Sequence, residues 1–291
     1  MSTDTIRLAD LHTPQSPNWC PGCGDFGILM GIKKATAALG RAQEDTCVVS
    51  GIGCSGKISH YINTYGFEGL HGRTMPVAQA IKLANHDLNV VAIGGDGDGY
   101  GIGMGHFMHA MRRNINMTYI VHNNQIYGLT KGQYSPTTEK GMKSSSSPHG
   151  AMEEPMNPMK LALASDGIGF IARGFAGDIK GLHELILEGM QYNGFALIDV
   201  LQPCVTFNKI NTYEFFKARV YKLQEDNSYD VTDKIEAMKR AEEWDERIAT
   251  GVFYKKELPS YEDGIQAIQE TPLVQHEIEN IDIEPLMKEY I

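Results

Sequence analysis

The sequence predicts an α/β fold, in which a doubly wound and mostly parallel sheet is followed by an acidic C-terminal extension. Short apolar runs alternate with segments of helical apolar spacing between residues 20 and 205, an order typical of βαβ units. The run at 89–93 is an uninterrupted apolar strand, as expected for a parallel sheet covered on both faces. Nearly the whole net charge of −10 lies in residues 211–291, which hold 10 basic residues against 19 acidic ones.

Local signals along the chain predict the individual elements. Residues 25–38 are expected to form a helix, because apolar side chains recur there at helical spacing. Asp25 is a candidate N-cap for this helix and Gly40 a candidate stop. Further helices are expected at 77–86, 103–113, 158–165, 179–192 and, in the extension, from Asp233 to about Ala249. Strands are expected at 47–50, 89–93, 117–121, 170–174 and 196–201.

The chain is expected to have two regions. Residues 1–209 are predicted to form one large domain, and residues 210–291 a partly helical acidic extension. Within the first region, residues 131–158 are rich in Ser, Gly, Pro and Thr and are expected to form a long loop. Such a loop in a compact domain is usually a lid or a segment that contacts a partner.

Composition narrows the class of protein. The chain has 42% hydrophobic and 21% charged residues, which is ordinary for a globular protein. Its acidic balance argues against binding to nucleic acid or to an anionic membrane, because both need a basic surface. The polar start lacks the pattern of a signal peptide, and no apolar run reaches the ~20 residues of a membrane span. We therefore expect a cytoplasmic protein, whose five cysteines are metal ligands, catalytic thiols or core residues.

Polar side chains follow two successive strands. Asp96 lies in the Gly-rich segment 94–99 after one strand, and Asn124 follows the next strand, 28 residues later. The carboxyl ends of neighbouring parallel strands face one crevice, so these side chains are predicted to bind one Mg²⁺ beside a phosphate group. A Gly-Asp-Gly segment alone is often only a turn. The segment does not fit an EF-hand calcium loop, because Tyr100 and Phe107 occupy ligand positions. It also fits a Rossmann dinucleotide-binding fingerprint poorly, because the acidic residue that would bind the ribose is absent.

The cysteines form a second candidate site. Cys20 and Cys23 form a Cys-x-x-Cys pair that suits a thioredoxin-like motif, a zinc site or a cluster. The thioredoxin-like interpretation lacks a buried strand before the pair, and a zinc ribbon lacks its second pair. Cys54 and Cys204 follow strands and are candidates to join the pair at one rim of the sheet, whereas Cys47 is predicted to be a core residue. Four thiolates suit zinc or an iron–sulfur cubane equally well.

Several motifs in sequence order resemble those of one enzyme family. They are Trp19-Cys20-Pro21-Gly22-Cys23-Gly24, Gly51-Ile52-Gly53-Cys54-Ser55-Gly56-Lys57, His71-Gly72-Arg73, Gly95-Asp96-Gly97-Asp98 and Asn123-Asn124-Gln125-Ile126-Tyr127-Gly128-Leu129-Thr130-Lys131-Gly132-Gln133. Over residues 17–205 the chain resembles the β subunit of 2-oxoacid:ferredoxin oxidoreductases, with a thiamine-diphosphate-binding fold. The resemblance implies oxidative decarboxylation of a 2-oxoacid to its acyl-CoA, or the reverse carboxylation, with electrons passed to ferredoxin.

The resemblance also implies three cofactors and their ligands. A [4Fe–4S] cluster would be held by Cys20, Cys23, Cys54 and Cys204. Mg²⁺ would be held by the side chains of Asp96 and Asn124 and the carbonyl of Ile126. Thiamine diphosphate would contact Ile52, Gly53, Cys54, Ser55, His71, Gly97, Asp98, Gly128 and Leu129. Lys57 and Lys131 are the cations nearest these motifs, and we hypothesise that they bind the carboxylates of the substrate.

The resemblance implies a partner chain as well. In this family a glutamate from a separate α region drives thiamine to its ylid, and no residue of this chain is assigned that role. We therefore expect activity only with an α subunit, in an αβ or (αβ)₂ assembly. The Cys-Pro-Gly-Cys-Gly-Asp-Phe-Gly opening favours 2-oxoglutarate as substrate, with pyruvate as the alternative. The rival classes are a non-redox thiamine enzyme and a thioredoxin-like or zinc-stabilised interaction protein.

Overall fold

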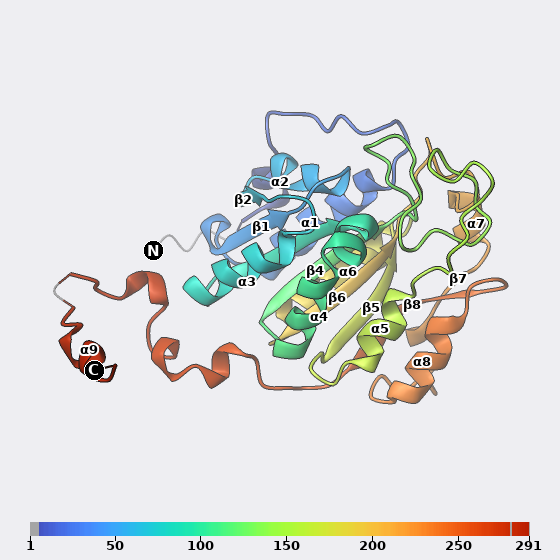
Figure 1. Cartoon of the computed structure of the whole chain (residues 1–291). Coiled ribbons are helices and arrows are strands. Elements are labelled where there is room, and N and C mark those ends of the chain that lie inside the picture. The colour runs from blue at the N-terminus through green and yellow to red at the C-terminus, as the bar shows by residue number, and fades with distance from the viewer. Residues whose placement is uncertain (1–5, 280, 291) are drawn as a thin grey trace.

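An eight-stranded sheet forms the centre of the structure, a computed structural model that describes residues 6–279 and 281–290 (Figure 1). The strand order is β2-β1-β3-β4-β6-β5-β8-β7. The strands are β1 (Thr46–Ser50), β2 (Tyr65–Glu68), β3 (Asn89–Gly95), β4 (Met117–Asn123), β5 (Phe170–Phe175), β6 (Phe195–Leu201), β7 (Val220–Lys222) and β8 (Ile248–Lys255). Neighbours pair in parallel except β5 and β8, which are antiparallel. The predicted mostly parallel α/β sheet is confirmed.

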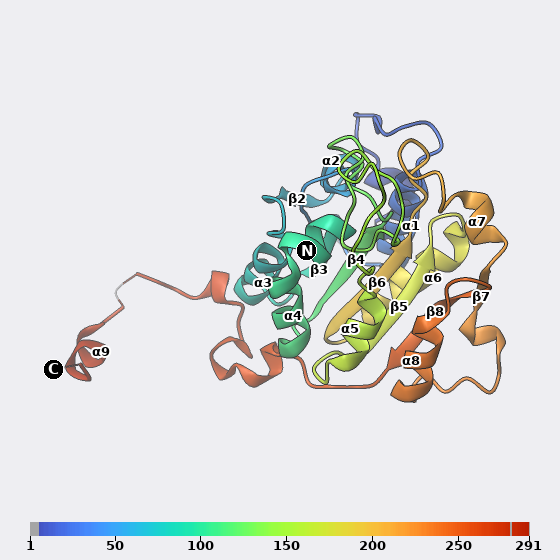
Figure 2. The ribbon, with the colours of Figure 1, turned by 45° about the vertical axis from the view of Figure 1, so that its right-hand side comes forward.

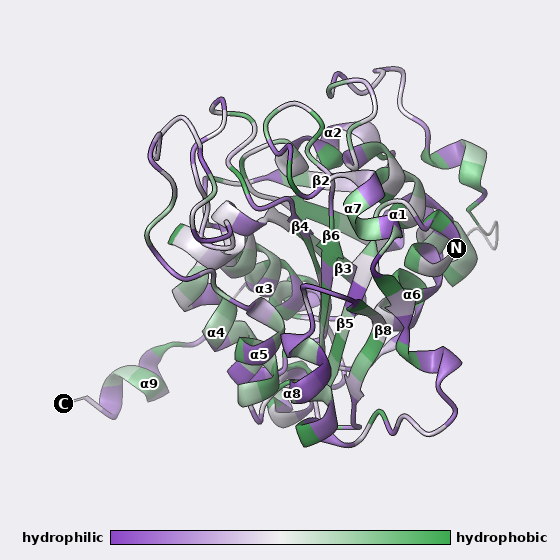
Figure 3. Cartoon of the chain, turned by 90° about the vertical axis from the view of Figure 1, so that its right-hand side faces the viewer, coloured by the Kyte–Doolittle hydropathy of each residue, from purple (hydrophilic) through white to green (hydrophobic). Residues whose placement is uncertain are grey.

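Helices cover both faces of this sheet. The helices of the described residues are α1 (Asp25–Leu39), α2 (Ile58–Tyr61), α3 (Thr74–Ala84), α4 (Met104–Arg113), α5 (Pro158–Ala164), α6 (Ile179–Gln191), α7 (Tyr213–Lys217), α8 (Lys234–Glu242) and α9 (Glu284–Lys288), of which α9 lies away from the sheet (Figure 1). On one face, α1 and α6 pack Ile32 and Ile186 against Ile120 of the sheet. On the other face, α3, α4, α5 and α8 bury apolar side chains such as Phe107 against Tyr119. Figure 3 shows largely hydrophobic strands in the sheet and helices that carry both hydrophobic and hydrophilic residues.

The strand register brings four loops to one edge of the sheet. Ser50 of β1 pairs with Ile93 of β3, and Gly95 pairs with His122 of β4. Asn123, the last residue of β4, pairs with Leu201 of β6. Because these strands are parallel and in this register, the loops that follow them begin side by side. The motifs that begin at Gly51, Gly95 and Asn123 lie at these strand ends, as does Cys204, whereas the Cys20 motif precedes α1 and the His71 motif lies between β2 and α3.

The segment after α8 differs from the prediction. A single helix from Asp233 to about Ala249 is wrong, because α8 ends at Glu242 and β8 begins at Ile248. Branched and aromatic residues dominate the run 248–255, and such residues favour a strand. Gly251 has a φ of +107°, which a helix cannot accommodate. Strand β8 pairs with β5, and β7 pairs with the other side of β8 and forms that edge of the sheet.

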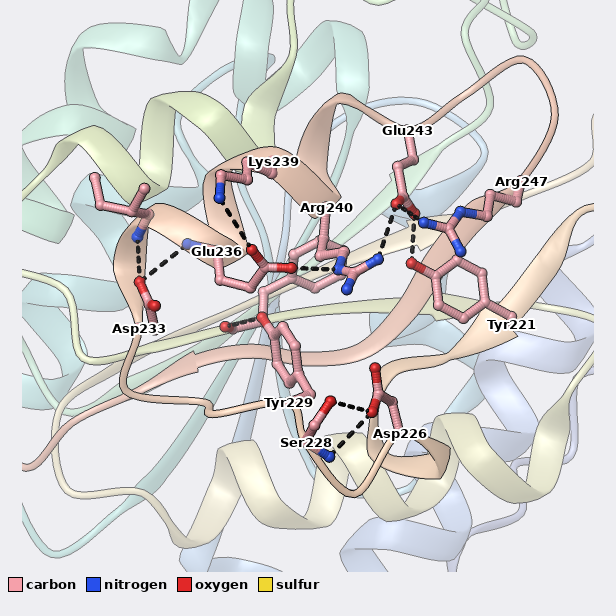
Figure 4. A network of polar contacts seen from close by, with 12 residues as sticks. Tyr221, Asp226, Ser228, Tyr229, Asp233, Glu236, Lys239, Arg240, Glu243 and Arg247 are labelled. Carbon is pink, nitrogen blue, oxygen red and sulfur yellow. Dashed lines mark hydrogen bonds and ion pairs between the residues drawn. The ribbon is translucent and has the colours of Figure 1, made fainter.

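Charged side chains fix α8 and the turn after it (Figure 4). Arg240 forms an ion pair with Glu236 at 2.9 Å and donates to Glu243 at 3.2 Å, and Glu243 also pairs with Arg247 at 2.6 Å. Tyr229 donates its hydroxyl to the carbonyl of Phe253 in β8, at 2.6 Å. Part of the acidic charge of the extension is therefore paired within the extension itself, which contributes strands β7 and β8 to the sheet. The boundary between residues 209 and 210 stays a prediction.

The last described segment runs beneath the sheet and then leaves it. The side chain of Asn114, at the end of α4, donates to the carbonyl of Pro259 at 2.9 Å, and Glu262 accepts from the backbone N–H of Asn116. Beyond residue 272 the chain extends away from the sheet, with α9 at its far end (Figures 1 and 2). Among the helices of the described residues, none is long and apolar enough to cross a membrane.

Candidate active site

A cavity of about 270 Å³ lies where the loops after β1, β3 and β4 meet. Every residue predicted to contact thiamine diphosphate or Mg²⁺ lines it: Ile52, Gly53, Cys54, Ser55, His71, Asp96, Gly97, Asp98, Asn124, Ile126, Gly128 and Leu129. Gly95, Tyr127 and Thr130 line it as well; they belong to the motifs in the sequence, but no cofactor contact was predicted for them. The cavity therefore collects residues that are up to 78 positions apart in the sequence.

Asp96 is a buried carboxylate at the base of this cavity. Its Oδ2 accepts hydrogen bonds from the hydroxyls of Ser135, at 2.5 Å, and Thr137, at 2.6 Å. Burial raises the pKa of Asp96 to about 6, and the two hydroxyl donors partly oppose this effect. Ser135 and Thr137 belong to the long loop 131–158, which the sequence correctly predicts to be irregular but not to contact Asp96.

Asn124 has a fixed amide orientation. Its Oδ1 accepts from the backbone N–H of Ile126 at 3.1 Å, and its Nδ2 donates to Oε1 of Gln202 at 2.8 Å. A carboxylate, an amide oxygen and a backbone carbonyl thus line one cavity in Asp96, Asn124 and Ile126. All three are hard oxygen donors of the kind that Mg²⁺ prefers, so the residues present fit this ion.

Asp98 joins three loops around the cavity. Its Oδ1 accepts from the backbone N–H groups of Gly72, at 2.8 Å, and Ile52, at 3.1 Å. Nδ1 of His71 lies 3.1 Å from the same oxygen, and Thr74 donates its hydroxyl to Oδ2 at 3.1 Å. Asp98 is 2% exposed. This carboxylate therefore holds the segments around residues 52 and 72 against the Gly-Asp-Gly loop.

Two features of the cavity wall suit a phosphorylated ligand. The hydroxyl of Ser55 is buried and has no hydrogen-bond partner among the described residues, so it can donate to a ligand oxygen. A β-carbon on Gly97 would lie 2.1 Å from the ring of Tyr127, so only glycine fits there. Tyr127 also donates its hydroxyl to the carbonyl of Gly97 at 3.1 Å. These features fit the thiamine diphosphate predicted from the sequence.

The predicted cluster cysteines lie beside the same cavity. A β-carbon on Gly128 would be 3.6 Å from the sulfurs of both Cys54 and Cys204, so both thiols adjoin one point of the cavity wall. Burial raises the pKa of Cys54 to about 12, and the charges of Asp25, Cys204 and Cys20 add to this shift. Burial, and then the charge of Asp25, likewise raise the pKa of Cys23.

The remaining cysteine is separate from these four. Cys47 lies in β1 within the core between the sheet and α3, as the sequence predicts. Within residues 6–279 and 281–290, no three His, Cys, Asp or Glu side chains are placed to hold a metal ion together. Whether the four thiols bind a [4Fe–4S] cluster therefore stays a prediction, which the convergence of Cys54 and Cys204 on Gly128 supports.

The two lysines lie outside the lining of the cavity. Lys57 donates to Oδ1 of Asn18 at 2.9 Å, and Lys131 is exposed and has a φ of +75°. Lys57 is close enough to Cys54 for its charge to favour the thiolate of that residue. Their role in binding the substrate stays a prediction.

Comparisons with known proteins identify the family. A sequence model described as the C-terminal TPP-binding domain of thiamine pyrophosphate enzymes matches residues 51–200. A second, described as the C-terminal part of the pyruvate ferredoxin oxidoreductase β subunit, matches residues 204–270. The 2-oxoacid:ferredoxin oxidoreductase subunit β of Sulfolobus sp is 49% identical over 267 residues, which cover 88% of this chain and 87% of the relative. This chain belongs to the family of 2-oxoacid:ferredoxin oxidoreductase β subunits.

More specific relatives fall within this β-subunit family. The 2-oxoglutarate oxidoreductase subunit KorB of Mycobacterium tuberculosis is 45% identical over 199 residues, covering 68% of this chain and 53% of the relative. A solved 2-oxoglutarate:ferredoxin oxidoreductase from Magnetococcus marinus, with 2-oxoglutarate, coenzyme A and succinyl-CoA bound, matches with a TM-score of 0.90 and 38% identity. That match covers 99% of this chain and 97% of the other. The β subunit described here is thus part of a thiamine-diphosphate-dependent oxidoreductase.

Proposed function

We propose that this β subunit, with an α subunit, catalyses the oxidative decarboxylation of 2-oxoglutarate. The reaction converts 2-oxoglutarate and coenzyme A to succinyl-CoA and CO₂, and two electrons reduce two ferredoxins one at a time. It can also run in reverse as a reductive carboxylation. The observation that carries the proposal is the position of Gly128, which lines the cofactor cavity and adjoins the sulfurs of Cys54 and Cys204.

The cavity residues would hold thiamine diphosphate and Mg²⁺. Asp96, Asn124 and Ile126 would bind the ion through oxygen atoms, and the free hydroxyl of Ser55 would donate to the diphosphate. Asp98 would keep its loops in place around the cofactor. Bound thiamine diphosphate supplies an electron sink for decarboxylation.

The cysteines would hold a [4Fe–4S] cluster at the wall of this cavity. Cys20, Cys23, Cys54 and Cys204 are the proposed ligands, and the cluster would accept electrons singly and pass them to ferredoxin. The loop 52–55 takes part in both sites, because Cys54 belongs to the cluster set while its neighbours line the thiamine cavity. A short electron path follows from this arrangement.

The substrate assignment has its own support. Relatives named 2-oxoglutarate oxidoreductase subunit KorB and 2-oxoglutarate synthase subunit KorB are 45% and 41% identical to this chain, and the solved structural neighbour has 2-oxoglutarate bound. Pyruvate is the second candidate, because the model that matches residues 204–270 is that of a pyruvate enzyme. We propose that Lys57 and Lys131 contribute positive charge toward the carboxylates of the substrate.

The test uses the β subunit co-expressed with its α subunit and purified without oxygen. We expect about four irons per β subunit, a broad absorbance near ~400 nm, and viologen reduction that depends on coenzyme A and is faster with 2-oxoglutarate than with pyruvate. A colourless protein that retains thiamine diphosphate would instead indicate a non-redox thiamine enzyme. The isolated β subunit should be inactive, and robust turnover by it would contradict the proposed need for an α subunit.

A pair of buried cysteines provides a matched control. Cys204→Ala should lose the absorbance near ~400 nm and the iron. Cys47→Ala makes the same change at a core position and should keep both, since Cys47 lies in the core away from the cavity. Equal iron contents in the two variants would refute the proposed ligand set.

Replacing Lys57 and Lys131 with Met should raise the KM for 2-oxoglutarate. Unchanged activity and unchanged substrate preference would refute the proposed role of these lysines.

A further inference from the structure

Gln202 lies directly between the two proposed cofactor sites. It follows the last residue of β6 and is 1% exposed. Its Oε1 accepts from Nδ2 of Asn124 at 2.8 Å, and its Nε2 points to the sulfur of Cys23 at 3.4 Å. One side-chain amide therefore contacts a proposed Mg²⁺ ligand and a proposed cluster ligand.

Two backbone groups determine which way this amide pair is oriented. The N–H of Ile126 can only donate, so the atom of Asn124 facing it must be Oδ1, and Nδ2 must face Gln202. The carbonyl of Pro203 can only accept, so the atom of Gln202 near it at 3.4 Å must be Nε2. The two requirements agree, and together they direct an N–H of Gln202 toward Cys23.

The main chain around Gln202 holds this position. The N–H of Gln202 donates to the carbonyl of Asn123 at 3.1 Å, and the N–H of Gly24 donates to the carbonyl of Pro203 at 3.1 Å. A β-carbon on Gly24 would lie 2.7 Å from the side chain of Gln202, so the turn of Cys23 packs tightly against it. The contact between the two sites is thus built into the packing of the strand ends.

We propose that Gln202 is a positioning residue that couples the two cofactor sites of the β subunit. Its carbonyl keeps the amide oxygen of Asn124 turned toward the cation, and its N–H stabilises the thiolate of Cys23 as a cluster ligand. This inference rests on the proposed function, because it assumes that both cofactors bind where the preceding section places them.

Both halves of the coupling have measurable consequences. Groups that orient a metal ligand typically change metal affinity by about 10- to 100-fold when they are removed. Hydrogen bonds to cluster sulfurs raise the reduction potential, because they stabilise the more negative reduced state. Loss of Gln202 should therefore weaken Mg²⁺-dependent binding of thiamine diphosphate and lower the midpoint potential of the cluster.

The test compares three variants in the complex with the α subunit. Gln202→Met keeps the side-chain length and removes both contacts, whereas Gln202→Glu keeps an acceptor for Asn124 but loses the N–H toward Cys23. Gln79→Met is the control, because Gln79 is also a buried amide but lies in α3 and donates to the carbonyl of Met75. Thermal melts report folding, iron analysis reports loading, calorimetry reports thiamine diphosphate affinity with Mg²⁺, and EPR-monitored titration reports the midpoint potential.

We expect Gln202→Met to bind thiamine diphosphate at least about tenfold more weakly and to show a lower midpoint potential. We expect Gln202→Glu to keep the affinity and show only the lower potential. A loaded Gln202→Glu complex with the wild-type potential would overturn the contact with Cys23. A Gln202→Met complex with the affinity of Gln79→Met would overturn the contact with Asn124. A wild-type complex without iron would instead contradict the proposed function.

Discussion

Replacing Asp98 with alanine tests whether one carboxylate holds the cavity loops together. The change removes the acceptor of two backbone N–H groups, those of Ile52 and Gly72, and of the hydroxyl of Thr74. The side chain of His71 is partly exposed and can bond to water instead, so the loss of its contact with Asp98 should change the free energy of unfolding little. The three remaining donors are buried or partly buried. The two backbone N–H groups lose their acceptor, whereas the hydroxyl of Thr74 still has the carbonyl of Ile93 at 3.4 Å.

The three hydrogen bonds give the size of the effect. A hydrogen bond to a charged group contributes about 1.5–3 kcal/mol, and contributions of neighbouring bonds are not fully additive. We therefore expect Asp98→Ala to lower the free energy of unfolding by about 3–5 kcal/mol. At about 2 °C per kcal/mol for a chain of this size, the melting temperature should fall by roughly 6–10 °C. Asp98→Asn retains a neutral acceptor and should lose about half as much.

Thermal melts of the purified protein measure the loss of stability, and calorimetric titration measures the affinity for thiamine diphosphate. Asp230→Ala is the matched control, because the exposed Asp230 also accepts from a backbone N–H and a hydroxyl, both of Thr232 at 2.8 Å. We expect this control to melt within about 2 °C of the wild type. If Asp98→Ala melts with the control and binds thiamine diphosphate normally, Asp98 does not organise the cavity.

Two further predictions concern stability away from the cavity. Gly27→Ala in α1 should lower the melting temperature, because the new β-carbon would lie 2.2 Å from the carbonyl oxygen of Ala176. Gly105→Ala in α4 meets no atom within 4 Å and should raise it through helix propensity, by up to about 1 kcal/mol. Burial lowers the pKa of Lys82 from 10.5 to about 8, so between these values the unfolded chain binds more protons. Denaturant titrations measure the free energy of unfolding. Between pH 8 and 10.5 this free energy should rise by about 2–3 kcal/mol more in the wild type than in Lys82→Met, and Lys34→Met, at an exposed lysine, is the control. If the pH profiles of the wild type and Lys82→Met are parallel, the prediction is wrong.

Strand ends and glycine motifs were predictable because their signals are local. The apolar run at 89–93 predicts β3, and the Gly-Asp-Gly segment directly after it predicts the loop that follows. The spacing from Asp96 to Asn124 then follows from the parallel order of β3 and β4. This is why all residues predicted to bind the cofactor or Mg²⁺ line one cavity.

The supporting residues were not predictable, because their contacts cross long stretches of irregular chain. Ser135 and Thr137 reach Asp96 from positions 39 and 41 residues later, and Gln202 reaches Asn124 over 78 residues. Nothing in a Ser- and Thr-rich loop indicates which hydroxyl turns inward. Strand β8 was missed for another reason, since the helical pattern of α8 precedes it without a proline or glycine to mark the boundary.

The buried charges beneath the cavity explain why a cation belongs at Asp96 in the proposed function. Asp199 is also fully buried, but it has the guanidinium of Arg173 at 3.7 Å and accepts from Tyr100 at 3.0 Å. Asp96 accepts from the neutral hydroxyls of Ser135 and Thr137, and no Lys, Arg or His of the described residues forms an ion pair with it. The hydroxyl oxygen of Thr137 lies 2.6 Å from Asp96 and 2.9 Å from the amide oxygen of Asn123, whose Nδ2 donates to Asp199 at 3.1 Å, so neutral side chains separate the two carboxylates. A divalent cation bound from the cavity side would give Asp96 the compensation that Arg173 gives Asp199, because an ionised carboxylate is stable in a protein interior only when it is paired.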